Sequence, residues 1–269
     1  MPADDVRRPL NPLKALLDSD GVALGGVLTA PSVQVAQALG RAGFDWVLVD
    51  MEHYPMDVRD VHEAIAALAA TPATPIVRIR WNVEWLAKPV LDVGALGIVF
   101  PMIRSREEAE AAVASVKYPP AGTRGWGPSY ATLTWGISGA DYARAANEEI
   151  LTVALIEHVE AVENIAEIAA TPGVDVAFIA TNDLAASLGH LGDLEHAEVK
   201  RAIRRIEKAV LESPAKLGGI GGAADRAREM IQRGYRFLNM GADVDLMKRT
   251  AEALLAEVRG GGAGAQGRG

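Results

Sequence analysis

The chain has no cysteine, no long apolar run and no concentrated block of basic residues. Without cysteine there are no disulfides, no thiolate metal ligands and no cysteine nucleophile, which fits a cytoplasmic protein. No run approaches the roughly 18 apolar residues of a membrane span, and the N-terminus lacks the apolar core of a signal peptide. Lys and Arg number 27 against 35 Asp and Glu, and this net charge of −8 argues against nucleic acid or an anionic membrane as the main partner.

Eight short apolar runs are present, and most lack the alternation of a half-exposed strand, as expected for strands buried on both faces. Helical patterns separate them. Eight strand–helix units predict an α/β chain folded as a single (β/α)8 TIM barrel. An open doubly wound sheet is the competing architecture, but no G-x-G-x-x-G fingerprint or P-loop follows the first strand. The expected strands are residues 22–28, 46–50, 75–79, 97–101, 152–156, 176–180, 217–221 and 237–241.

The domain is expected to cover residues 1–259, with a flexible Gly-rich tail at 260–269. One connection, residues 104–150, is too long for a plain connector. It opens with a helix for which Ser105 and Glu108 predict a capping box. The Pro-, Gly- and aromatic-rich stretch 118–136 follows, and we expect it to form a lid or an interface.

Titratable side chains gather where the predicted strands end, which is where barrel enzymes build their sites. Glu157 and Asp183 end adjacent strands and suit Mg²⁺ or Mn²⁺, although each carboxylate is also suited to capping a helix or pairing with an arginine. Arg78 fits a substrate contact or an ion pair with a neighbouring acid. Asp50 and His53 fit an orienting acid and a base.

Seven stretches of the chain, taken together, resemble the HpcH/HpaI class II pyruvate aldolases over roughly residues 13–258. In sequence order they are AGFDWVLVDMEH, VRIRWN, LDVGALGIVFPM, YPPAGTRG, ALIE, NDLAASLGHLGD and FLNMGAD. Their order and register carry the resemblance, since each stretch alone is a weak signal.

The resemblance implies a lyase that cleaves or forms 4-hydroxy-2-oxo acids, with pyruvate or a close 2-oxo acid as donor and an aldehyde as the second product. It implies a divalent metal cation (Mg²⁺, Mn²⁺ or Co²⁺) held by Glu157 and Asp183. It also implies a homo-hexamer in which the last helix is exchanged between subunits.

Further residues take roles from the same resemblance. Arg78 matches the arginine that stabilises the enolate, and His53, oriented by Asp50, matches the acid/base residue. Asp92 matches an acid at the subunit contact near the site. A Schiff-base mechanism needs a lysine inside the barrel, and Lys216 only precedes a predicted strand.

Two positions that contact the donor in the family differ here. Familiar members have Gln where this chain has Leu155, and they read G-P-A before the metal aspartate where this chain reads Ala180, Thr181 and Asn182. The backbone of that segment holds the donor carboxylate in the family, so we expect an altered donor preference.

Three other functions are compatible with a barrel of this kind. A CoA-ester lyase of the citramalyl or malyl type requires basic residues for the CoA phosphates, and no basic cluster stands out. An oxaloacetate decarboxylase-like activity would use the same enolate chemistry. A barrel that only binds an oxo acid is the non-enzymatic alternative, suggested by Leu155, Thr181 and Asn182.

Overall fold

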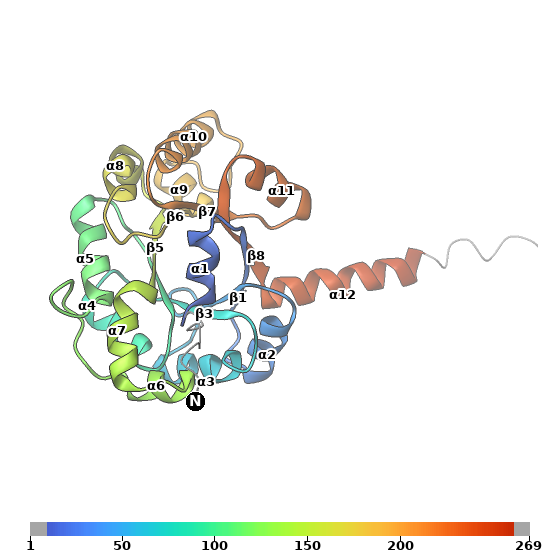
Figure 1. The fold of residues 1–269 in the computed structure, drawn as a ribbon. Helices are drawn as coiled ribbons and strands as arrows, with labels where there is room; N and C mark the ends of the chain where they lie inside the picture. Colours follow the sequence, from blue (N-terminus) through green and yellow to red (C-terminus); the bar gives the residue numbers. More distant parts are fainter. Residues whose placement is uncertain (1–9, 261–269) are drawn as a thin grey trace, which may run out of the picture.

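A closed barrel of eight parallel strands forms the centre of the molecule in the computed structural model, which describes residues 10–260 (Figure 1). Each strand pairs with the next one along the chain, and β8 pairs with β1. The predicted single (β/α)8 barrel is therefore confirmed.

The strands lie within two residues of their predicted bounds. Most of their residues are buried, because the barrel interior covers one face and the helices cover the other. They are β1 (Ala23–Leu28), β2 (Trp46–Asp50), β3 (Thr74–Arg78), β4 (Gly97–Phe100), β5 (Leu151–Ile156), β6 (Val176–Ile179), β7 (Lys216–Ile220) and β8 (Tyr235–Ala242).

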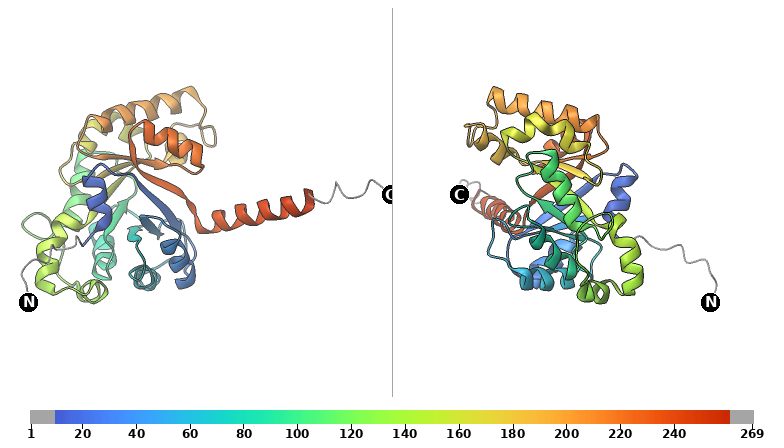
Figure 2. Two further views of the ribbon diagram at one scale, coloured as in Figure 1. Left: turned by 45° about the vertical axis from the view of Figure 1, so that its right-hand side comes forward. Right: turned by 90° about the vertical axis from the view of Figure 1, so that its left-hand side faces the viewer.

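Most helices surround the barrel, as Figures 1 and 2 show. They are α1 (Pro12–Asp18), α2 (Val33–Arg41), α3 (Val58–Leu68), α4 (Glu84–Asp92), α5 (Arg106–Val116), α6 (Ser129–Trp135), α7 (Gly139–Glu149), α8 (Val159–Ala169), α9 (Thr181–Ser187), α10 (Ala197–Leu211), α11 (Ala224–Gln232) and α12 (Asp243–Gly260).

Helix α1 closes the amino-terminal end of the barrel. Asn11 caps it and donates its side-chain amide to the carbonyls of Leu96 and Glu149, which precede β4 and β5. Leu13 and Leu17 of α1 join the buried cluster that fills the barrel. The cavity described below is therefore closed at this end and opens at the other.

The stretch 118–136 is not a lid over its own barrel. It contains α6, and α7 follows it, so much of the segment is helical. Trp135 donates its indole N–H to the carbonyl of Gly94, just before β4 begins, so α6 lies at the amino-terminal side. Trp126 and Tyr130 remain exposed there, which keeps the interface alternative open.

Helix α12 projects away from the barrel (Figures 1 and 2). Several apolar side chains along it are exposed, namely Val244, Met247, Leu254, Leu255 and Val258. The helix runs to Gly260, and residues 261–269 of the expected tail lie outside the described part of the chain. Within residues 10–260 no helix is long and apolar enough to cross a membrane.

Candidate active site

A cavity of about 410 Å³ opens at the carboxyl-terminal ends of the strands, where barrel enzymes have their sites. This volume suits a small molecule. Its floor is apolar and includes Trp46, stacked on Phe237 with ring centroids 4.2 Å apart. Its polar rim consists of Asp50, His53, Tyr54, Arg78, Asn182, Asp183, Asn239 and Asp245.

Asp50 pairs with Arg78, and this corrects the expected pairing of Asp50 with His53. The two residues lie opposite one another in the register of β2 and β3. Arg78 donates its Nε to Asp50 Oδ1 at 2.9 Å and its Nη2 to Oδ2. Asp50 is fully buried, so the adjacent guanidinium takes its carboxylate, whereas His53 lies past the strand end with 55% of its side chain exposed.

Glu52 is the acid that lies beside His53, and the sequence interpretation did not include it among the site residues. Its Oε2 lies 3.2 Å from Arg78 Nη1 and 3.6 Å from His53 Nε2. Burial raises the pKa of the Glu52 carboxyl to about 7. Because β2 ends at Asp50 and the chain bends after it, residues 52 and 53 need not point to opposite sides as they would in a strand.

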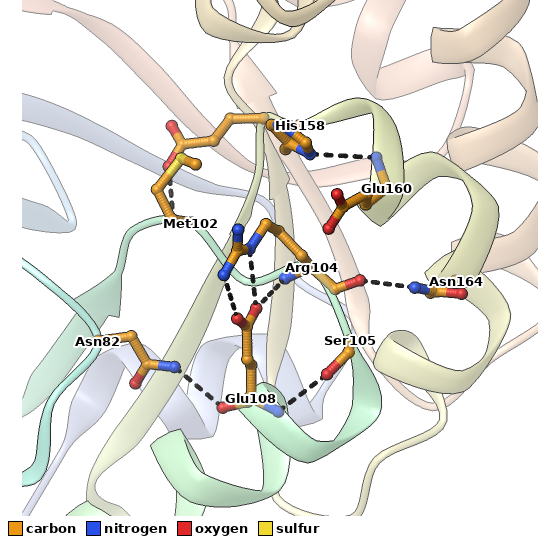
Figure 3. A network of polar contacts seen from close by, with 9 residues as sticks. Asn82, Met102, Arg104, Ser105, Glu108, His158, Glu160 and Asn164 are labelled. Carbon is orange, nitrogen blue, oxygen red and sulfur yellow. Dashed lines mark hydrogen bonds and ion pairs between the residues drawn. The ribbon is translucent and has the colours of Figure 1, made fainter.

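Glu157 follows β5 and is buried at the same end of the barrel. Its Oε1 accepts a 2.6 Å hydrogen bond from the backbone N–H of Met102. Burial, reinforced by the negative charges of Glu52 and Asp183, raises the pKa of the Glu157 carboxyl to about 7. His158, by contrast, caps α8 through its Nδ1, which accepts from the N–H of Glu160 (Figure 3).

The β4–α5 loop that presents Met102 to Glu157 is fixed by side-chain contacts (Figure 3). Arg104 binds the carboxylate of Glu108, and its carbonyl accepts from Asn164. Ser105 caps α5 as predicted, but the second half of the capping box is absent. The N–H of Glu108 donates to the Ser105 hydroxyl. The Glu108 carboxylate instead accepts from the backbone N–H of Arg104, because the Arg104 guanidinium holds it there.

Asp183 and the positions next to it lie at the start of α9, beside Glu157. Asn182 and Asp183 line the cavity, and Thr181 is buried in the same first turn. Leu155 also lines the cavity as a buried apolar side chain. This part of the cavity is thus more apolar than a glutamine at that position would make it.

The donor set at this end of the barrel fits a hard divalent cation. Glu52, Glu157 and Asp183 come from three different strand ends, and the charge of Asp183 contributes to the raised pKa of both Glu52 and Glu157. Arg78 is the nearest cation, and two acids already hold it. Oxygen ligands with room for water are what Mg²⁺ and Mn²⁺ prefer.

A second group of possible ligands lies away from the cavity. Within residues 10–260, one group of three possible ligands has its ligand atoms within 4.8 Å of one another. It consists of His190, His196 and Glu198. The two imidazoles are stacked, with centroids 3.5 Å apart. Stacked rings do not aim in-plane lone pairs at one ion, and His196 already uses Nδ1 to cap α10. This group therefore does not form a metal centre as it stands.

Asp92 does not reach the cavity of its own barrel. It ends α4, on the side where β4 begins, and its Oδ1 accepts a 3.0 Å bond from Nη2 of the fully buried Arg124. Lysine is also absent from the described lining of the cavity. Lys216 is the first residue of β7 rather than a residue before it, and it pairs with Asp20.

The barrel, the one-ended cavity and the acidic rim with a fixed guanidinium define the class of protein: a (β/α)8-barrel enzyme acting on a small polar molecule. Comparison with known proteins makes this specific. A profile described as HpcH/HpaI aldolase/citrate lyase matches residues 28–250.

Individual relatives cover almost the whole chain. The hydroxypyruvate/pyruvate aldolase of Paraburkholderia phytofirmans is 40% identical over 93% of this chain and 98% of its own length. The 2-dehydro-3,6-dideoxy-6-sulfogluconate aldolase of Pseudomonas putida is 36% identical over 91% and 96%. A crystal structure of an HpcH/HpaI aldolase/citrate lyase family protein from Burkholderia cenocepacia superposes with a TM-score of 0.86 at 37% identity, covering 93% and 99%.

The chain belongs to the HpcH/HpaI aldolase/citrate lyase family. It is a carbon–carbon lyase of the aldolase type.

Proposed function

We propose that this chain is a metal-dependent class II aldolase that cleaves 4-hydroxy-2-oxo acids to pyruvate, or a close 2-oxo acid, and an aldehyde. The observation that carries the proposal is the fixed Arg78. Asp50 and Glu52 hold its guanidinium at the rim of a cavity that Asp183 also lines. A rigid cation beside an oxygen-rich metal site is suited to stabilising an enolate.

Glu157 and Asp183 are the residues that would hold the metal, and Mg²⁺, Mn²⁺ and Co²⁺ are the candidates. When bound, the cation supplies Lewis-acid stabilisation of negative charge on the donor's keto oxygen. The start of α9, at Thr181 and Asn182, is suited to holding the donor carboxylate. The apolar Leu155 favours a donor whose third carbon carries no polar group.

The chain's own residues then account for the movement of protons and electrons in the cleavage direction. His53 takes the proton from the 4-hydroxyl group as the bond between C3 and C4 breaks. The aldehyde leaves, and the bonding electron pair moves onto the donor as an enolate, whose oxygen faces the N–H groups of Arg78. A proton from solvent then adds to C3 to give pyruvate, and His53 returns its own proton to solvent.

The rival activities have less support from the geometry. Arg78 is the one arginine in the described cavity lining and lysine is absent, so CoA phosphates lack partners there. The relatives are named as aldolases, which gives no support to a barrel that only binds an oxo acid. Decarboxylation of oxaloacetate proceeds through the same enolate, so we expect it as a side activity.

The direct test is release of pyruvate from a panel of 4-hydroxy-2-oxo acids, with and without Mg²⁺, Mn²⁺ or Co²⁺. Metal-dependent release from at least one of them is expected. If none is cleaved while a CoA ester is, the proposed function is wrong.

Replacing His53 by Ala is expected to slow aldol cleavage by about 100-fold or more, while exchange of the methyl protons of pyruvate is affected far less. The reason is that His53 handles the 4-hydroxyl proton and not the C3 proton. Glu52→Gln should also slow cleavage more than exchange, but by a smaller factor, because Glu52 lies 3.6 Å from His53 Nε2 and acts through it. The measurement compares the cleavage rate with deuterium incorporation into pyruvate, and equal small losses in both would count against this role.

We also propose a homo-hexamer with α12 exchanged between subunits and Asp92 placed near a neighbour's site. The projecting helix with its exposed apolar residues supports this. Light scattering should then give about 170 kDa, which is six protomers of 28.4 kDa. A protomer mass at micromolar concentration contradicts the proposal.

A further inference from the structure

One side of the cavity rim is formed by side chains that the cleavage steps leave unused: Tyr54, Asn239 and Asp245. Asp245 lies in the first turn of α12. The start of that helix is fixed, because Asp243 is buried and accepts bonds from the backbone N–H groups of Thr29 and Ala30, both at 3.0 Å. Asp245 is therefore held at the rim.

These three side chains offer groups that hydroxyls bind well. Asn239 accepts a bond from Gly241 N–H through its Oδ1, which leaves its NH₂ group without a protein partner in the described chain. Tyr54 has a hydroxyl, and its pKa is raised by burial and by the carboxylates of Asp50 and Asp245, so those charges lie near it. Together the side offers one carboxylate acceptor, one amide donor and one phenol.

Cations on this side of the rim are few. Arg78 is the one arginine among the described lining residues, and Asp50 and Glu52 engage it. Arg249, one turn along α12 from Asp245, approaches Gly241 but does not line the cavity. A negative group on the incoming aldehyde would meet Asp245 before any unengaged lining cation.

We infer that the aldehyde partner is a neutral, hydroxylated aldehyde, and that Asp245 is the residue that selects against an anionic one. This rests on the proposed aldolase function. Asp245 and Asn239 bind the hydroxyls next to the carbonyl, and the carboxylate of Asp245 repels a terminal carboxylate or sulfonate. Selection comes from one attractive and one repulsive contact at the same position.

The test runs the reaction in the direction of carbon–carbon bond formation, with pyruvate as donor and Mg²⁺ or Mn²⁺ present. Two matched pairs of aldehydes serve as acceptors. Glyceraldehyde and propanal share a chain length and differ in hydroxyls. Succinic semialdehyde and butanal share a chain length and differ in charge. The native protein should prefer glyceraldehyde to propanal and butanal to succinic semialdehyde, as measured by kcat/KM.

Variants then assign the preference to a residue. Asp245→Lys should raise kcat/KM for succinic semialdehyde relative to butanal by about tenfold, and Asp245→Asn by about threefold. Both variants should lower the preference for glyceraldehyde over propanal. Glu212→Lys makes the same charge change at the exposed residue just after α10 and should leave both ratios unchanged. Arg249→Gln should also leave them unchanged, because Arg249 does not line the cavity.

Three results would overturn the inference. The first is a native preference for succinic semialdehyde over butanal. The second is a set of kcat/KM ratios that Asp245→Lys leaves unchanged. The third is a loss of activity with succinic semialdehyde in Arg249→Gln but not in the Asp245 variants. Each requires turnover, so it leaves the aldolase function standing. If no acceptor is consumed with any metal, the proposed function itself fails, and the inference fails with it.

Discussion

Arg78→Lys is expected to lower kcat by about 100- to 1000-fold while the protein stays folded. Arg78 holds Asp50 through two nitrogens and presents a third to Glu52 at 3.2 Å, which fixes the plane of the guanidinium. Lysine keeps the charge but has no planar array of donors, so it cannot satisfy both acids and still face the enolate oxygen. The measurement is turnover per folded molecule, beside the melting temperature.

Arg80 provides a matched control on the same strand end. It donates to the backbone carbonyls of Met51 and Met56 and does not line the cavity. Arg80→Lys should therefore keep turnover near normal. If Arg78→Lys melts several degrees lower yet turns over normally, Arg78 is a structural ion pair and the proposed role is wrong.

Removing divalent metal with a chelator should reduce pyruvate formation by about 1000-fold or more, since a Lewis-acid metal supplies several kcal/mol of charge stabilisation. Mg²⁺, Mn²⁺ or Co²⁺ should restore it. Glu157→Gln should show a comparable loss that added metal does not restore, because the amide is a neutral and weaker ligand. Activity and metal content after dialysis are the two measurements.

Glu160→Gln is the control for this prediction. Glu160 is an exposed acid in the first turn of α8, three residues after Glu157, and its backbone N–H is bound to His158. The variant should keep both activity and metal response. A chelated native protein that keeps full activity would refute the metal requirement.

The barrel was predictable because its strands are buried on both faces. A strand such as Trp46–Asp50 is apolar up to its last residue, Asp50, so its bounds can be read directly from the sequence. The strand ends then place Arg78, Glu157 and Asp183 at one end of the barrel, because parallel strands share a direction.

The partners within the site could not be predicted in the same way. Asp50 lies three residues from His53 in sequence, but its real partner is Arg78, 28 residues away on the next strand. That choice depends on the register between β2 and β3, which one chain's pattern does not specify. Glu52 cannot be placed by strand alternation either, because β2 ends at Asp50, two residues before it.

Helices α6 and α7 were not anticipated either. The α6 sequence, Ser129–Trp135, is short and contains threonine and aromatic residues with low helix propensity. Its helix follows a Pro- and Gly-rich loop and is stabilised by packing near Gly94, a contact that sequence pattern does not reveal.

In the proposed hexamer, the projecting α12 would link the stability of this protein to its concentration. An isolated helix of 18 residues is marginal in water, and this one leaves several apolar side chains exposed along its length. A neighbouring subunit that covers them adds binding free energy to folding free energy. In the proposed hexamer the melting temperature should therefore rise with protein concentration, and dilution should destabilise the fold.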